Sequence, residues 1–170
     1  MRCVDRVGPQ RFTLADVAAE LGVIRQTVYR YYASTDELFV AVGEHELAGF
    51  ANDITARVSR ITEPSAWVVE ALAWTYEQLH VRPYLTLLLA AGRSERFSRG
   101  VTSKEAIDVG HDILKRSRVD WAAAGYDSRD IDELIELMLR ILQSLVIDPP
   151  NPPRTGRELR RCLRGWIGPH

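Results

Sequence analysis

Apolar residues recur along this chain at the three- and four-residue spacing of amphipathic helices, and no segment shows the alternation of a half-buried strand. Thr13 with Asp16, and Ser34 with Glu37, have the spacing of capping boxes and mark two helix starts. Pro64 is placed to end the long helix that follows Ser34. The pattern predicts an all-α protein, with helices over residues 13–21, 25–32, 35–63, 65–81, 84–91, 103–124, 128–147 and 155–167, a loop at 93–100 and a proline-rich linker at 148–153.

The first two expected helices meet at Gly22, which is the arrangement of a helix-turn-helix. Tyr31 and Tyr32 are expected to pack in the core of this head or at its junction with the body. The small core between the two helices is expected to hold Leu14, Val17, Ala18, Leu21, Val23 and Val28.

The second of these helices carries the candidate DNA contacts, because a recognition helix lies in the major groove with its early residues at the base edges. Arg25, Gln26 and Thr27 are placed for this task, since Arg can bind guanine and Gln can bind adenine through two hydrogen bonds. Tyr29 and Arg30 would reach phosphates, which position a protein without specifying sequence. The alternative is a solvated helix surface, or simple packing for Tyr29.

The stretch FTLADVAAELGVIRQTVYRYYASTDEL, residues 12–38, resembles the TetR family of transcriptional regulators. The resemblance implies a DNA-binding head whose contacts include Thr13 and Tyr32, a helical body that binds an unknown small-molecule effector, and a homodimer that presents two heads to a palindromic operator in double-stranded DNA. Matching positions are Thr13, Val17, Ala18, Gly22, Val23, Thr27, Tyr29, Tyr31, Tyr32, Ser34 and Leu38, with Leu21 in place of the usual Ala.

The chain departs from the family pattern at both ends of the proposed DNA-facing surface. Ile24 replaces Ser, so the recognition helix loses its usual N-cap, at a cost of about 1 kcal/mol. Thr35 replaces Lys and removes a phosphate contact. Only Met1 to Val7 precedes Gly8, so the first helix of the head is expected to be truncated. These departures keep open an alternative, a helical dimer that binds a small molecule or protein and has lost DNA binding.

The rest of the chain is expected to form a separate body, with a head at residues 1–45 and a ligand-binding and dimerisation domain at 46–170. The candidate ligand residues are large aromatic side chains and one histidine, because aromatic groups with a few polar partners suit a concave site. They are Trp67, Trp74, Tyr84, His111 and Trp121, and simple core packing is the alternative for each.

The last two expected helices are the candidates for a dimer interface, because residues 128–147 are apolar nearly all round and such a helix needs burial on several sides. The arginines of the last helix are expected to be solvated or to meet the acidic start of the preceding helix across the dimer. The expected interface residues are Ile135, Met138, Leu142, Leu159, Leu163 and Trp166.

Composition narrows the function further. The formal net charge of −1 gives no strong global attraction to nucleic acid or membrane, so DNA binding has to rest on local geometry. The cysteines, Cys3 and Cys162, lie at opposite ends without metal-ligand spacing, and no catalytic constellation or phosphate loop occurs. We expect a cytoplasmic regulator without a metal, a cofactor, enzymatic activity or a membrane segment.

Overall fold

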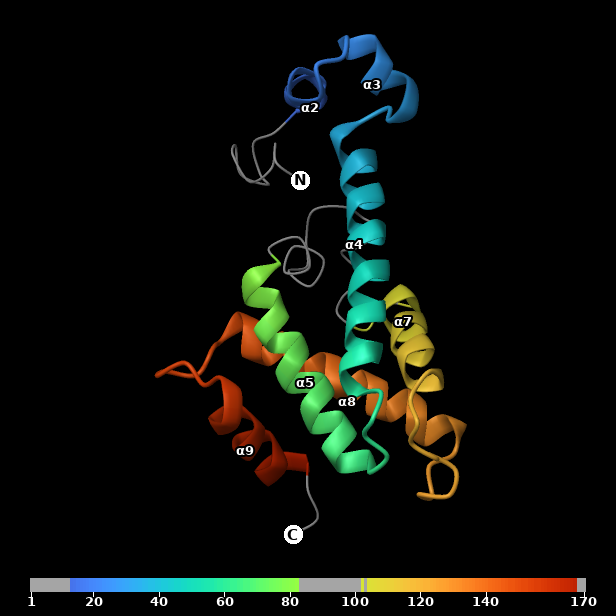
Figure 1. Ribbon diagram of the computed structural model, residues 1–170, viewed down its shortest axis with the longest axis vertical. Helices are drawn as coiled ribbons and strands as arrows, with labels where there is room; N and C mark the ends of the chain where they lie inside the picture. Colours follow the sequence, from blue (N-terminus) through green and yellow to red (C-terminus); the bar gives the residue numbers. More distant parts are fainter. Residues whose placement is uncertain (1–12, 83–101, 103, 168–170) are drawn as a thin grey trace. The chain divides into compact units, whose positions relative to one another are not determined.

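The computed structural model describes residues 13–82, 102 and 104–167, and every regular element in these ranges is a helix. The all-α prediction is confirmed for this part of the chain (Figure 1). The helix expected at 84–91 and the loop expected at 93–100 lie outside the described residues. The helices are α2 (Leu14–Leu21), α3 (Arg25–Tyr31), α4 (Thr35–Val58), α5 (Pro64–Val81), α7 (Lys104–Lys115), α8 (Ser128–Ile147) and α9 (Gly156–Ile167).

The chain divides into two compact units, residues 1–46 and residues 47–170, and the division falls inside α4. The first unit holds α2, α3 and the beginning of α4. The second unit holds the remainder of α4 and the described helices from α5 to α9.

The first unit is organised by the capping signals that the sequence carries. Thr13 and Asp16 form the predicted capping box, in which the Thr13 hydroxyl accepts the Asp16 N–H at 3.3 Å and the Asp16 carboxylate accepts the Thr13 N–H at 2.7 Å. Gly22 ends α2 in the left-handed conformation, with φ of 66°, which glycine adopts without a steric penalty. The two short helices are therefore delimited by local interactions and joined by a tight turn.

The capping box predicted at the start of α4 is present only in part, because Glu37 bonds the N–H of Ala33 and not that of Ser34. The Ser34 hydroxyl accepts the Glu37 N–H at 3.1 Å, and the Glu37 carboxylate accepts the Ala33 N–H at 2.6 Å. The start of α8 differs slightly from the prediction, because Asp127 and not Ser128 is its N-cap.

The core of the helix-turn-helix is smaller than predicted. Leu14, Ala18 and Val28 are buried, but Leu21 is 62 % exposed and Val23 is 39 % exposed. Two helices this short can fully cover only a few side chains between them. Leu21 is the last residue of α2 and Val23 lies in the turn, so the expectation that both are core residues is wrong.

The second unit is built around α5, which contributes several fully buried side chains among the described residues. Trp67, Leu72 and Tyr76 are at most 1 % exposed, and α5 packs against both α8 and α9 (Figure 1). The start of α5 is fixed by Glu63, whose carboxylate accepts the N–H groups of Ser65 and Ala66. These hydrogen bonds lower the pKa of Glu63, because they favour the charged carboxylate.

The helix predicted over 103–124 is shorter than expected, because α7 ends at Lys115. Ser117 and Asp120 follow, and both side chains compete with helical hydrogen bonding by binding nearby groups. The Ser117 hydroxyl accepts the Trp121 indole N–H at 3.0 Å, and the Asp120 carboxylate accepts the Ala123 N–H at 3.0 Å. A separate turn therefore replaces the last part of the predicted helix.

Candidate nucleic-acid interface

The outward face of α3 consists of polar and aromatic side chains at helical spacing. Val28 is buried and points inward, whereas Arg25, Gln26, Tyr29 and Arg30 are exposed. Residues four apart lie on the same helix face, so Arg25 stands beside Tyr29 and Gln26 beside Arg30. This face presents two guanidinium groups, an amide and a phenol together.

The positive charge of the described head is concentrated on this face. Between Thr13 and Glu46 the arginines are Arg25 and Arg30, and the segment contains no lysine. The carboxylates of the same segment are on α2 and α4. A phosphate backbone would therefore meet its cationic contacts within the described head on α3.

The side chains of the other expected DNA contacts are half-buried or already hydrogen-bonded within the head. The Thr13 hydroxyl donates to the Asp16 carboxylate at 2.8 Å and is committed to the capping box. Thr27 and Tyr32 are half-buried, and Tyr32 is the C-cap of α3. Ile24 forms no side-chain capping hydrogen bond and is 70 % exposed, as its substitution for Ser leads one to expect.

Tyr31 was expected to pack in the core of the head or at its junction with the body, and its side chain is 65 % exposed. Arg30 lies over the Tyr31 ring, with the guanidinium carbon 5.1 Å from the ring centroid, and its Nη2 donates to the Tyr31 hydroxyl at 3.1 Å. Helical periodicity could not reveal this contact, because adjacent residues on a helix point in different directions. The long Arg30 side chain makes the contact possible at the last turn of α3.

The aromatic residues expected to bind a ligand divide between different places in the body. Trp67 is fully buried and packs edge-to-face with Trp121 at 5.5 Å, and Trp121 packs in the same way with Tyr126 at 5.4 Å. The Trp67 indole N–H is the buried side-chain polar atom in the described part of the chain that has no hydrogen-bond partner. This cluster therefore contains one unused donor.

The other expected ligand residues have different partners. Trp74 stacks on Phe50 with ring centroids 5.5 Å apart, and His111 pairs with Asp132 of α8 at 2.6 Å. Tyr84 lies outside the described residues.

Four of the six residues expected at a dimer interface are buried inside the protomer. Ile135, Leu142, Leu159 and Leu163 are at most 6 % exposed, because α8 and α9 direct these side chains toward the core that they share with α5. The core of the protomer already covers these four side chains, and their place at a dimer interface stays a prediction. Met138 is half-buried and Trp166 is 56 % exposed. Two exposed apolar side chains that the prediction missed, Leu137 and Ile147, also lie on α8.

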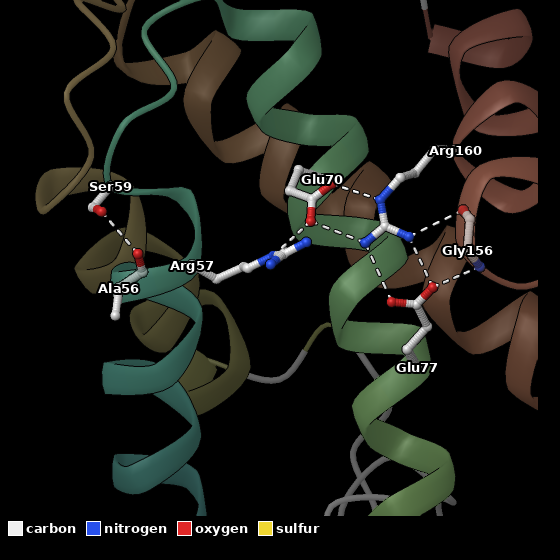
Figure 2. A network of polar contacts seen from close by, with 7 residues as sticks. All are labelled: Ala56, Arg57, Ser59, Glu70, Glu77, Gly156 and Arg160. Atoms are coloured by element: carbon white, nitrogen blue, oxygen red, sulfur yellow. Dashed lines mark hydrogen bonds and ion pairs between the residues drawn. The ribbon is translucent and has the colours of Figure 1, made fainter.

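One arginine of α9 has partners that the sequence did not indicate (Figure 2). Arg160 Nε donates to Glu70 at 2.6 Å, Arg160 Nη1 donates to Glu77 at 2.8 Å, and Arg57 of α4 donates to Glu70 at 2.7 Å. The Gly156 N–H also donates to Glu77, at 2.9 Å. Arg160 is therefore neither solvated nor paired with the acidic start of α8, and it ties α9 to α5.

The network changes the ionisation of its members. Hydrogen bonds from Arg160 lower the pKa of Glu70, although partial burial opposes them. Partial burial raises the pKa of Glu77, but hydrogen bonds from Arg160 and from the Gly156 N–H outweigh it, and the pKa is lowered. The two carboxylates raise the pKa of Arg160 in turn.

A metal site and a membrane-spanning helix each require features that the described residues lack. Among the described side chains, no group of three or more His, Cys, Asp and Glu could hold a metal ion. No helix in the described ranges is both long and apolar enough to cross a membrane. Cys162 is half-buried on α9, and Arg154 Nη1 lies 3.1 Å from its sulfur.

Two short helices joined by a glycine turn, with a cationic outward face on the second helix, define a helix-turn-helix head. Residues 1–42 match the family model described as "Bacterial regulatory proteins, tetR family". The resemblance to the tetR family is confirmed for this N-terminal segment.

A curated protein and the solved structures give further comparisons. The Nucleoid occlusion factor SlmA of Pasteurella multocida (strain Pm70) is 33 % identical over 82 residues, which are 48 % of this chain and 41 % of that protein. The match thus spans less than half of the relative's length. No solved structure matches the chain.

Proposed function

We propose that this protein is a cytoplasmic DNA-binding transcriptional regulator, a repressor that a small molecule releases from a palindromic operator, and that it has no enzymatic activity. The observation that carries the proposal is the outward face of α3 in a tetR-family head. Arg25, Gln26, Tyr29 and Arg30 are exposed there, and Val28 anchors the helix from behind.

The residue types on this face suit two tasks, recognition of bases and binding of phosphates. Arg25 and Gln26 begin α3, where side chains of a recognition helix meet base edges, and each can form a bidentate pair with a purine. Tyr29 and Arg30 are one turn further along and suit phosphate oxygens. Sequence preference would then depend on Arg25 and Gln26, and affinity on all four side chains.

A homodimer would supply the second head that a palindrome requires. The exposed apolar side chains of the last two helices, Leu137, Ile147 and Trp166, are the candidates for its contact surface. Met138 is half-buried and would lie at its edge. In a dimer that presents both recognition helices to one side of the duplex, half-sites would be about one turn apart, roughly 34 Å.

The effector would bind in the body and act by preferring one conformation of the protein over another. The buried Trp67 N–H supports this part of the proposal, because buried donors nearly always have a partner. An effector that accepts a hydrogen bond from the indole would supply one. The neighbouring rings of Trp121 and Tyr126 would provide apolar contact.

Selection from a random pool of DNA duplexes tests the proposal. The full chain should enrich an inverted repeat, and the enriched duplex should shift in a gel in a salt-sensitive manner. Arg25→Ala should relax the preference at defined positions within each half-site. Enrichment of no sequence would reject the regulator.

Ile24 favours a second candidate, the helical dimer without DNA binding, because α3 begins without a side-chain cap. In that case Ile24→Ser would stabilise the first unit but create no sequence preference. The curated relative's name favours another candidate, a DNA-bound factor that acts in nucleoid occlusion. Binding sites spread over a whole chromosome would then replace a few promoter sites.

A further inference from the structure

The Arg30–Tyr31 pair is the exposed side-chain contact of α3 that the functions assigned above do not use. Arg30 was expected to reach a phosphate, and Tyr31 was expected to pack in the core of the head or at its junction with the body. Instead, both side chains are exposed and touch each other. The contact has two components, a cation over a ring at 5.1 Å and a hydrogen bond of 3.1 Å.

These components restrict the guanidinium more than either would alone. The ring limits the distance and tilt of the guanidinium plane, and the phenol oxygen fixes the direction of one Nη2 donor. A guanidinium has five N–H donors in a planar fork, so one bond to Tyr31 leaves an edge with two donors for a second acceptor. A phosphate is the acceptor that such an edge binds in bidentate fashion.

The charges around the pair also suit a phosphate as the second acceptor. Arg25 lies on the outward face of α3 with Arg30, and no described contact pairs either with a carboxylate. A free arginine side chain samples many rotamers and loses that freedom when it binds. Pre-organisation by Tyr31 reduces the loss.

We infer that Arg30 and Tyr31 form one phosphate-binding unit, in which Tyr31 is a positioning residue that holds the Arg30 guanidinium for a phosphate of the DNA backbone. The inference rests on the proposed function, since it assumes that the head binds DNA. It assigns Tyr31 a role through Arg30 and leaves base recognition to Arg25 and Gln26.

A double-mutant cycle on the selected duplex tests the inference, with Arg30→Ala, Tyr31→Phe and the double variant measured by fluorescence anisotropy at several salt concentrations. Arg30→Ala should weaken binding uniformly across sequences and lower the salt slope by about one per head. Tyr31→Phe should weaken binding about two- to fivefold in the wild-type background and have no effect when Arg30 is absent. Arg60→Ala is the matched control, because it removes an exposed arginine of the second unit, and it should leave the salt slope unchanged.

An equal effect of Tyr31→Phe in both backgrounds would overturn the inference, because Tyr31 would then act independently of Arg30. Unchanged binding in both single variants would overturn the inference as well. The proposed function would still stand in that case, because the wild-type chain binds the duplex. No binding by the wild-type chain would remove the proposed function and the inference together. Thermal melts of all variants check that each head is folded, and the exposure of both side chains leads us to expect unchanged melting.

Discussion

Gly110 determines how closely α7 can approach α8. A Cβ atom at this position would lie 2.5 Å from Cγ2 of Ile135, which is far inside van der Waals contact. Ile135 is almost completely buried, so it has little room to move aside. Glycine lowers the helix propensity of α7, but at position 110 the close packing against α8 requires it.

Gly110→Ala should destabilise the protein, although alanine is the better helix former. Overpacking costs about 1–3 kcal/mol, against a gain of up to about 1 kcal/mol from helix propensity. We expect a net loss of about 1 kcal/mol or more in the free energy of urea unfolding. Gly49→Ala is the matched control, because nothing lies within 4 Å of its added Cβ on α4, and it should be neutral or stabilising. Equal stability of the two variants would contradict the packing argument.

At the scale of elements, α9 is held on α5 by a buried apolar seam and by the Arg160 network. Leu159 and Leu163 are at most 1 % exposed, and Arg160 lies between them in sequence with its side chain 14 % exposed. Arg57 joins the second half of α4 to the same Glu70 carboxylate (Figure 2). The network therefore connects helices that are distant in sequence but belong to one unit.

Arg160→Met should destabilise the second unit, because it leaves the largely buried Glu77 without its cation and leaves Glu70 with Arg57 alone. Breaking a buried pair costs about 3–5 kcal/mol and an exposed pair less than about 1 kcal/mol, so we expect about 2–3 kcal/mol here. Arg164→Met makes the same change at an exposed position of α9 and should cost less than about 0.5 kcal/mol. Urea unfolding at neutral pH distinguishes the two. A similar cost in both variants would mean that the network adds no stability.

The contribution of the Arg160 network to the free energy of unfolding should depend on pH. The pKa values of Glu70 and Glu77 are lowered in the folded protein, so the unfolded chain binds more protons just below pH 5, and acid weakens the wild type. Without Arg160 the lowering becomes smaller, because only Arg57 then acts on Glu70 and only the Gly156 N–H on Glu77. The stability difference between wild type and Arg160→Met should therefore be largest above about pH 5 and shrink as the pH falls through the lowered pKa values. A difference independent of pH would contradict the assignment.

The sequence predicted the elements well where local signals decide them. The capping box at Thr13 forms as expected, Ser34 caps the Glu37 N–H at the start of α4, and Gly22 ends α2. The prediction failed where the apolar periodicity continued but side chains bonded nearby groups in place of a helix. Ser117 and Asp120 do this after the end of α7. An amphipathic pattern also cannot say which neighbour covers the apolar face. In the protomer, α5 covers side chains of α8 and α9 that were expected at a dimer interface.

The candidate site was predicted less completely than the fold. The spacing of α3 correctly placed Arg25, Gln26, Tyr29 and Arg30 on the surface, because one helix has one buried stripe. It placed Tyr31 wrongly, since a short helix near a turn exposes positions that a longer helix would bury. The Arg30–Tyr31 contact depends on side-chain reach, which residue spacing does not encode.

At the scale of the whole molecule, two units divide the tasks that we propose: residues 1–46 for DNA and residues 47–170 for effector and dimer. α4 begins in the first unit and ends in the second, so it is the covalent link through which an effector would act. The tetR-family match ends at residue 42, within the first unit.

The proposed dimer gives a prediction at this scale. The full chain should sediment as a dimer, and Trp166→Ala should raise the dissociation constant at least about tenfold, because large exposed aromatic side chains are frequent interface anchors. Leu137→Asp should have a similar effect by placing a charge in the contact. Ala124→Asp, at an exposed turn, is the control and should leave the dimer intact. Dimers that resist both interface variants would place the contact elsewhere.

The specificity ratio of DNA binding tests the central claim most directly. Fluorescence anisotropy at one fixed salt concentration would compare the selected palindromic duplex with a scrambled duplex of the same composition. We expect the wild-type chain to prefer the palindrome by about 10³ or more, and the variant with Arg25→Ala and Gln26→Ala to lose at least about tenfold of that preference. Equal affinity of the wild-type chain for both duplexes would contradict the account.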